Sequence, residues 1–139
     1  MTTADSLRRI HIAAALITRA DGKVLLVRKR GTTAFMQPGG KLEPGEAVET
    51  ALRRELGEEL RLTGTIGAPD YLGRFTAPAA NEAGAVVEAE IFVLELVGDA
   101  VPQAEIEALC WVDPEVPGEI DLAPLTRDEV LPAWLRRRR

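Results

Sequence analysis

The sequence has very few of the residues that most enzymes use as nucleophiles or proton carriers. Its 139 residues include one cysteine, Cys110, one histidine, His11, and one serine, Ser6. A single cysteine excludes an internal disulfide and any CxxC zinc or redox motif. A Ser-His-Asp or Cys-His triad needs its nucleophile and base in contact, whereas Ser6 lies near the terminus and Cys110 in an apolar run. Carboxylates and a bound metal ion remain as the available chemistry.

The sequence also lacks an excess of positive charge and a long apolar segment near its start. The formal net charge is -5, whereas general nucleic-acid-binding proteins normally carry a basic balance or a large basic face. We therefore expect no nucleic-acid partner, and any nucleotide bound should be small. Residues 1–9 show neither a signal peptide nor a membrane-spanning helix. We expect a cytoplasmic protein without membrane contact, folded as a single domain over residues 1–139.

Apolar runs and turn-forming residues predict that the chain begins with a β-hairpin. Residues 10–18 and 24–29 are rich in β-branched and other apolar residues, and Asp21-Gly22 between them is a favoured hairpin turn. The following segment, residues 31–45, is rich in glycine and proline and is predicted to be a loop. A helix should then run from about Ala47 to Leu60, because Glu, Leu, Arg and Ala dominate there.

The second half of the chain predicts further strands and one more helix. Strands are expected over residues 65–75, 86–97 and 105–112. Thr126 and Glu129 have the spacing of a capping box, which predicts a helix starting at Thr126, and Pro132 should kink or shorten it. Strands before and after a central helix predict an α/β fold, with a mixed β-sheet covered by helices on both faces.

The central helix carries acidic residues where core residues would be expected. One stripe of the helix surface contains Val48, Ala51, Leu52, Glu55, Glu58 and Glu59. A glutamate-rich helix usually presents a solvated face, but carboxylates three and four residues apart repel each other, so a cation should lie among these three. Oxygen ligands without histidine or cysteine favour Mg²⁺, with Mn²⁺ as the alternative. Arg54 is placed to orient one of the acids from behind the ligands.

The segment from Gly40 to Leu62 resembles the Nudix box, G-x5-E-x7-R-E-U-x-E-E-x-G-U, in which U is aliphatic. Its fixed positions are matched by Gly40, Glu46, Arg54, Glu55, Leu56, Glu58, Glu59 and Leu62. Arg61 stands where the family has glycine, which bears on the left-handed end of the helix more than on the chemistry. The chain is identified on this basis as a member of the Nudix hydrolase superfamily, MutT-like in its short length.

The resemblance implies an α/β/α sandwich and a metal-dependent hydrolase that cleaves a phosphoanhydride in a nucleoside diphosphate derivative. It implies Mg²⁺ ligands at Glu55, Glu58 and Glu59 and at the Gly40 carbonyl. Glu46 and Arg54 would orient these ligands. We expect substrate contacts at Phe35, Gly39 and Gly40, and a homodimer is one option. A non-catalytic nucleotide sensor is the alternative, although the intact pairs Arg54-Glu55 and Glu58-Glu59 favour catalysis.

The substrate and the general base stay open at this point. The short segment before the first strand favours hydrolysis of a nucleoside triphosphate, ordinary or oxidised, to monophosphate and pyrophosphate, whereas Pro78 favours ADP-ribose or a nucleotide sugar. The base is one of the glutamates in the box, or Glu88 or Glu90, for which an exposed strand face is the alternative. Aromatic residues that could stack on a nucleobase are few: Phe35, Tyr71, Phe75 and Phe92. We assign no role to His11 and expect residues 136–139 to be a solvated basic tail.

Overall fold

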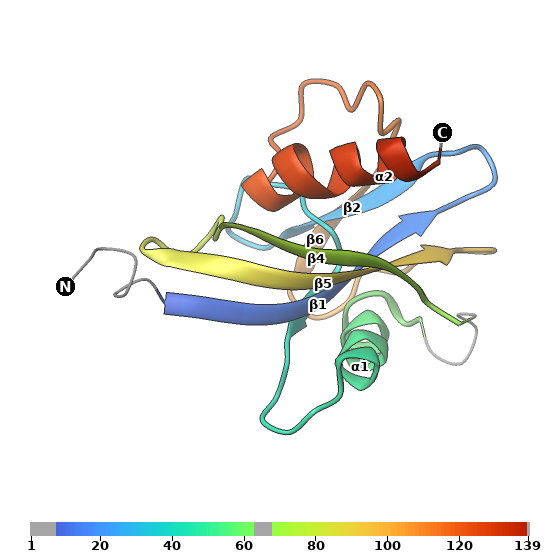
Figure 1. Ribbon diagram of the computed structural model, residues 1–139. Helices are drawn as coiled ribbons and strands as arrows, with labels where there is room; N and C mark the ends of the chain where they lie inside the picture. Colours follow the sequence, from blue (N-terminus) through green and yellow to red (C-terminus); the bar gives the residue numbers. More distant parts are fainter. Residues whose placement is uncertain (1–7, 63–67, 139) are drawn as a thin grey trace.

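The computed structural model describes residues 8–62 and 68–138 and shows a mixed β-sheet between two helical layers. In these residues six strands form one sheet with the order β4-β5-β1-β2-β6, and β3 pairs with β1 beside this path. The strands are β1 (Arg8–Thr18), β2 (Val24–Lys29), β3 (Gly39–Lys41), β4 (Asp70–Pro78), β5 (Ala85–Glu95) and β6 (Ile106–Val112). Helix α1 (Val48–Leu60) covers one face and helix α2 (Leu131–Arg137) the other (Figure 1). The predicted α/β/α sandwich is confirmed.

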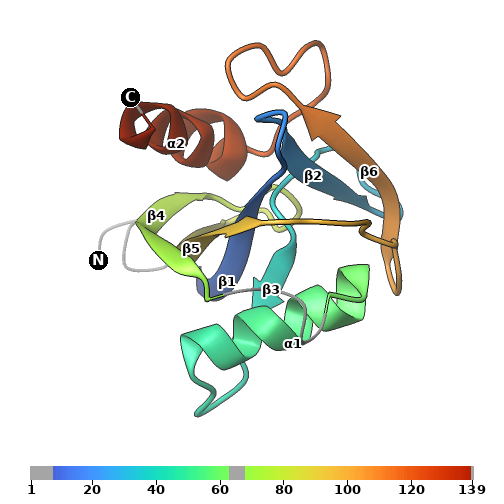
Figure 2. The ribbon, with the colours of Figure 1, turned by 90° about the vertical axis from the view of Figure 1, so that its right-hand side faces the viewer.

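Strand β1 lies in the middle of the sheet and is buried on both faces. Residues 13–17 along it are at most 1% exposed, because alternate side chains point to opposite faces and a helix covers each face (Figure 2). Ala13, Ala15 and Ile17 pack in the core with α1, whereas Ala14 and Leu16 pack in the core with α2. A continuous apolar run is what such a doubly covered strand requires.

The predicted turn at Asp21-Gly22 is confirmed. The strands β1 and β2 are antiparallel, with Thr18 opposite Val24. Gly22 has a φ of 84° and donates its N–H to the Arg19 carbonyl, and the Asp21 carboxylate accepts the N–H of Lys23. The expected strands agree with β4, β5 and β6 except at their ends, and residues 65–67 of the first lie outside the described residues.

Strand β3 corrects the prediction that residues 31–45 form only a loop. Gly39 and Gly40 pair with Ala14 and Ala13 of β1, which holds the middle of this segment in the sheet. The approach is very close, because a Cβ atom on Gly39 would lie 2.2 Å from the carbonyl oxygen of Ala13. Gly39 also has a φ of 150°, a conformation that other residues rarely adopt. The absence of side chains therefore lets these two residues form a strand here.

The C-terminal helical segment also differs from the sequence prediction. Thr126 does not cap a helix, because a π-helical turn, η2 (Leu125–Val130), contains it, and α2 follows directly. The N–H of Leu131 bonds to the carbonyl of Thr126, five residues earlier. Pro132 has no N–H and cannot make the α-helical bond to the residue four before it, which accounts for the wider turn at this point. Within the described ranges, no helix has the length and apolar character needed to cross a membrane.

Helix α1 ends in the left-handed conformation that the family's glycine would favour. Arg61 has φ 60° and ψ 25°, and its N–H bonds to the carbonyl of Gly57. Leu62 follows as a buried core residue and donates its N–H to the Leu56 carbonyl. The helix therefore ends as a glycine-terminated helix does, with an arginine in the strained position.

Replacing Arg61 by glycine should stabilise the protein. Left-handed backbone costs an L-residue more than glycine, so we expect Arg61→Gly to raise the free energy of unfolding by up to about 1 kcal/mol in urea titrations. The expected catalytic activity should stay within a few-fold, because the Arg61 side chain is exposed. Ala104→Gly is the matched control for the backbone effect, since Ala104 also has a positive φ, 54°, and lies outside residues 40–62. A hundredfold loss of activity in a folded Arg61→Gly protein would show that Arg61 contacts the substrate.

Candidate active site

Helix α1 packs against β3 through a contact between Glu55 and Gly40. The Glu55 carboxylate lies so close that a Cβ atom on Gly40 would be 2.5 Å from its carboxyl carbon. Ala51, Leu52 and Leu56 of the same helix are fully buried in the core beneath it. The buried apolar residues of α1 thus fix the helix on the sheet. This packing places Glu55 against the backbone of Gly40.

Arg54 is the cation that lies among the acids of this helix. Its Nε and Nη2 atoms donate to the two oxygens of Glu46 at 2.8 Å each, and Nη1 donates to Glu55 Oε1 at 2.9 Å. Nη1 also lies 3.6 Å from Glu58 Oε1. The hydrogen bonds from Arg54 lower the pKa of Glu46 to about 2, and those to Glu46 and Glu55 raise the pKa of Arg54. The arginine therefore links the loop before the helix to two of its acids.

Glu59 occupies a core position and has a different environment. Its residue surface is 3% exposed, and its Oε1 accepts the N–H of Gly39 at 2.9 Å. Burial raises the pKa of Glu59 to about 7, although the bond from Gly39 acts in the opposite direction. A carboxylate in such a place is costly to ionise unless a cation or donors neutralise it. The Glu59 oxygens thus lie beside the same glycine pair that Glu55 contacts.

The acidic side chains of α1 offer the oxygen donors that Mg²⁺ prefers. The third of them, Glu58, is 55% exposed at its side chain and lies 3.6 Å from Arg54 Nη1. Among the described residues, no three acidic, histidine or cysteine side chains converge on one point, since Arg54 holds the carboxylate of Glu55 and Gly39 holds that of Glu59. The donor set is made of carboxylate and carbonyl oxygens, which fits a hard divalent cation.

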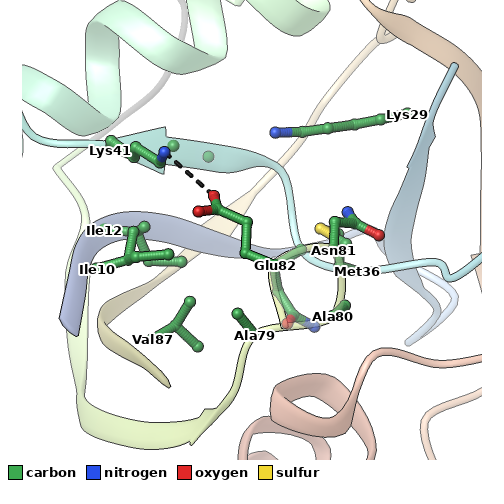
Figure 3. A pocket seen from close by; sticks show the side chains of 13 residues that line it. Ile10, Ile12, Lys29, Met36, Lys41, Ala79, Ala80, Asn81, Glu82 and Val87 are labelled. Carbon is green, nitrogen blue, oxygen red and sulfur yellow. Dashed lines mark ion pairs between the residues drawn. The ribbon is translucent and has the colours of Figure 1, made fainter. Parts of the chain in front are cut away.

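A cavity opens beside Gly39 and Gly40, on the other side of β3 from Glu55. Its walls come from β1, β2, β3, β5 and the connection between β4 and β5 (Figure 3). Lys41 and Lys29 reach its rim, and Lys41 forms an ion pair of 3.2 Å with Glu82 of the connection (Figure 3). A second hollow is lined by both lysines and by Gly40, Glu55 and Glu82. The hollow therefore joins the acids of α1 to the rim of the cavity.

The aromatic residues that the sequence suggested for nucleobase stacking lie elsewhere. None of the described residues that line the cavity is aromatic. Phe35 packs against the core under α2, and Arg28 lies 5.9 Å from its ring centre. Tyr71 contacts Phe92 edge to face, and Phe75 packs against the core on the α2 side. Sequence reasoning missed the cavity residues that carry nitrogen, oxygen or sulfur in their side chains: Lys29, Met36, Gln37, Lys41, Asn81 and Glu82. Only their proximity to Gly39-Gly40 in sequence could have pointed to Met36, Gln37 and Lys41.

Glu90 is held in a polar cluster that joins three strands. Its carboxylate accepts the hydroxyl of Tyr71 at 2.6 Å and Arg74 Nη2 at 2.6 Å, and lies 2.9 Å from His11 Nε2. The exposed strand face considered for this residue is wrong, because Glu90 is 5% exposed. Burial raises the pKa of Glu90, but the three hydrogen bonds outweigh it and lower the pKa to about 2. His11 thus has a structural partner, and Glu88 pairs with Arg9 at 2.7 Å.

A model of the NUDIX domain matches residues 7–134. The chain belongs to the Nudix family. It is 31% identical over 122 residues to the CTP pyrophosphohydrolase of Escherichia coli (strain K12), which covers 85% of this chain and 86% of that protein. It is 33% identical over 94 residues to the ADP-ribose pyrophosphatase of Methanocaldococcus jannaschii, covering 64% of this chain and 54% of that protein. The structure of the MutT protein from Methanosarcina mazei Go1 aligns with a TM-score of 0.78 and 25% identity, over 96% of this chain and 97% of that one. This Nudix chain is a hydrolase of a family whose named relatives are pyrophosphohydrolases.

The Glu90 cluster predicts a specific dependence of stability on pH. The pKa of Glu90 is about 2 in the folded protein, below its ordinary value of 4.5, so its contribution is complete above pH ~4.5 and is lost as the pH falls toward 2. We expect Glu90→Gln to lower the free energy of unfolding at pH 7 and to flatten its decrease between about pH 5 and pH 2 in urea titrations. Glu88→Gln, on the same strand, should change both less. Parallel curves for the wild type and Glu90→Gln would contradict the assignment.

Proposed function

We propose that this Nudix hydrolase cleaves a nucleoside triphosphate to the monophosphate and pyrophosphate in an Mg²⁺-dependent reaction. The packing of Glu55 on Gly40 supports this most directly, because it carries the acids of α1 to a hollow whose other walls include Lys29 and Lys41. The carboxylates of α1 suit a divalent cation. The two ammonium groups, which pair with Glu82 and Glu105 in this structure, suit phosphate oxygens. A polyphosphate with its metal ion matches both sides of this surface.

Glu55, Glu58 and Glu59 and the Gly40 carbonyl would hold the metal, with Mn²⁺ as an alternative ion. When bound, the metal neutralises phosphate oxygens and lowers the pKa of an attacking water molecule. Arg54 fixes the Glu55 carboxylate at 2.9 Å and is itself fixed by Glu46. These two residues orient a ligand rather than contact the substrate. Gly39 holds the Glu59 carboxylate through its N–H, so the glycine pair positions two of the acids.

ADP-ribose is the second candidate substrate. The relative from Methanocaldococcus jannaschii is named an ADP-ribose pyrophosphatase, and Pro78 lines an apolar cavity close to Gln37 in this chain. The relative named CTP pyrophosphohydrolase matches more of the chain, 85% against 64%. A nucleotide sensor without turnover is less well supported, because selection for binding alone would not keep all three glutamates. The triphosphate is therefore our first choice.

A substrate panel separates these candidates. The enzyme with Mg²⁺ is incubated with ordinary and oxidised nucleoside triphosphates and with ADP-ribose, and pyrophosphate and AMP are measured. We expect kcat/KM for pyrophosphate release from at least one triphosphate to exceed that for AMP formation from ADP-ribose. The reverse order would overturn the triphosphate proposal, and the absence of turnover with every compound would favour the sensor.

Removing one carboxylate tests the metal ligands. Millimolar Mg²⁺ should raise the melting temperature, because a ligand bound only by the folded state stabilises it. Glu59→Gln should stay folded but lose both this shift and turnover, since it removes the buried negative charge beside Gly39. Glu49→Gln is the matched control, because Glu49 is exposed on the first turn of the same helix. Normal activity in Glu59→Gln would exclude Glu59 as a ligand.

A further inference from the structure

Gln37 has a buried amide group of which only one half is paired. The residue is 6% exposed, and its Oε1 accepts the hydroxyl of Thr126 at 2.8 Å. Its Nε2 has no hydrogen-bond partner among the described residues. Buried donors are nearly always satisfied in folded proteins, because an unsatisfied one loses its bonds to water without replacement. The free N–H groups of Gln37 therefore indicate a position for an acceptor.

Gln37 lines two adjoining cavities that differ in character. The cavity beside Gly39 and Gly40 has Lys29, Lys41 and Glu82 at its rim (Figure 3). The neighbouring cavity is lined by aliphatic side chains and Gln37, which is its only polar side chain among the described residues. The residues common to both are Ile12, Met36, Gln37, Ala80 and Val87. Together the cavities have a charged end next to the proposed phosphate site and an apolar end with one amide group.

Such a combination is typical of a pocket for a nucleobase. Apolar walls accept the faces of a planar ring, and a single well-placed polar group reads one edge of it. Met36 is a flexible wall of both cavities, and Ala80 belongs to the connection after β4. Both walls line the cavities together with Gln37, so a ring between them would lie beside its amide group.

We propose that Gln37 Nε2 donates a hydrogen bond to a carbonyl oxygen of the substrate's base, which makes Gln37 a specificity-determining residue. This inference depends on the proposed function, because it assumes a nucleotide with its phosphates at Gly40. Thr126 holds Oε1 and so turns the donor side of the amide away from itself. Uracil, thymine, cytosine, guanine and hypoxanthine all carry a carbonyl oxygen that can accept from this donor. Adenine has none, and its amino group would meet another donor.

Inosine and adenosine triphosphates test the proposal directly, because their bases have the same two rings and differ at one edge, where a carbonyl replaces an amino group. In the wild type we expect kcat/KM for ITP to exceed that for ATP by about tenfold, the effect of about one hydrogen bond. Gln37→Met keeps the side-chain length and should reduce this preference to within about threefold. Gln103→Met is the matched control, since Gln103 lies outside both cavities.

Variants of Thr126 test how the amide is oriented. Thr126→Ser retains the hydroxyl and should retain the preference for ITP, whereas Thr126→Val removes the bond to Gln37 Oε1 and should weaken it. If Gln37→Met alone unfolds, the double variant Gln37→Met with Thr126→Val removes both buried partners together and serves in its place. A preference for ATP in the wild type would mean that the Gln37 oxygen faces the base, and would overturn the proposal.

A binding experiment gives a readout that does not depend on turnover. The sequence has two glutamines, Gln37 and Gln103, so a protein labelled with ¹⁵N-glutamine gives two side-chain amide nitrogen signals, each with a pair of proton cross-peaks. Titration with UMP should shift the signal that Gln37→Met removes and leave the Gln103 signal in place, whereas AMP should shift neither. Hydrolysis of ITP and ATP at equal rates, with no shift of the Gln37 signal by UMP, would refute the role of Gln37 and leave the hydrolase intact. Absence of any hydrolysis would instead refute the proposed function.

Discussion

Gly39 and Gly40 lie between strand β1 and helix α1 in a space that has no room for a Cβ atom. A methyl group at the first position would lie 2.2 Å from a carbonyl oxygen of β1, and at the second 2.5 Å from the carboxyl carbon of Glu55. The backbone of the two glycines thus contacts β1 on one side and the Glu55 side chain of α1 on the other. Because the helix is also fixed by its buried apolar residues, Glu55 and Glu59 are held beside the glycine pair. The position of the candidate metal ligands, of the cavity beside them and of Gln37 just before them all follow from this approach.

The hydrogen bonds of Arg54 explain in part how the fold tolerates the carboxylates of α1. Like charges at this separation destabilise a helix, and burial adds the loss of hydration. Arg54 offsets the first effect by bonding to Glu46 and Glu55 together. The loss of hydration is only partly offset at Glu59, because burial raises its pKa to about 7. Ionising Glu59 beside the backbone of Gly39 therefore remains costly, and a bound divalent cation would stabilise its negative charge.

Local patterns in the sequence were sufficient for the hairpin, helix α1, the acidic stripe and the family, because each depends on residues close together in the chain. Local patterns were insufficient where a residue far away in the sequence determines the local structure or the burial of a side chain. The strand at Gly39–Lys41 exists because β1 offers a partner, and turn-forming composition alone predicted a loop. Glu90 can be both buried and ionised because His11 and Tyr71, on two other strands, form hydrogen bonds with its carboxylate. The aromatic residues suggested for base stacking stay a prediction, and none of the described residues that line the two cavities is aromatic.

The π-helical turn η2 affects the cavity on the opposite side of the sheet from α1, because it contains Thr126. Thr126 and Glu129 have the spacing of a capping box, but a capping threonine would direct its hydroxyl to the backbone of its own helix. Pro132 cannot donate to the carbonyl four residues earlier, and the chain forms the wider turn η2 instead. Within that turn the Thr126 hydroxyl is released from capping and is fully buried against Gln37. Pro132 thus contributes to the orientation of the Gln37 amide. The capping-box rule fails at Thr126 because the fold uses its hydroxyl to position Gln37.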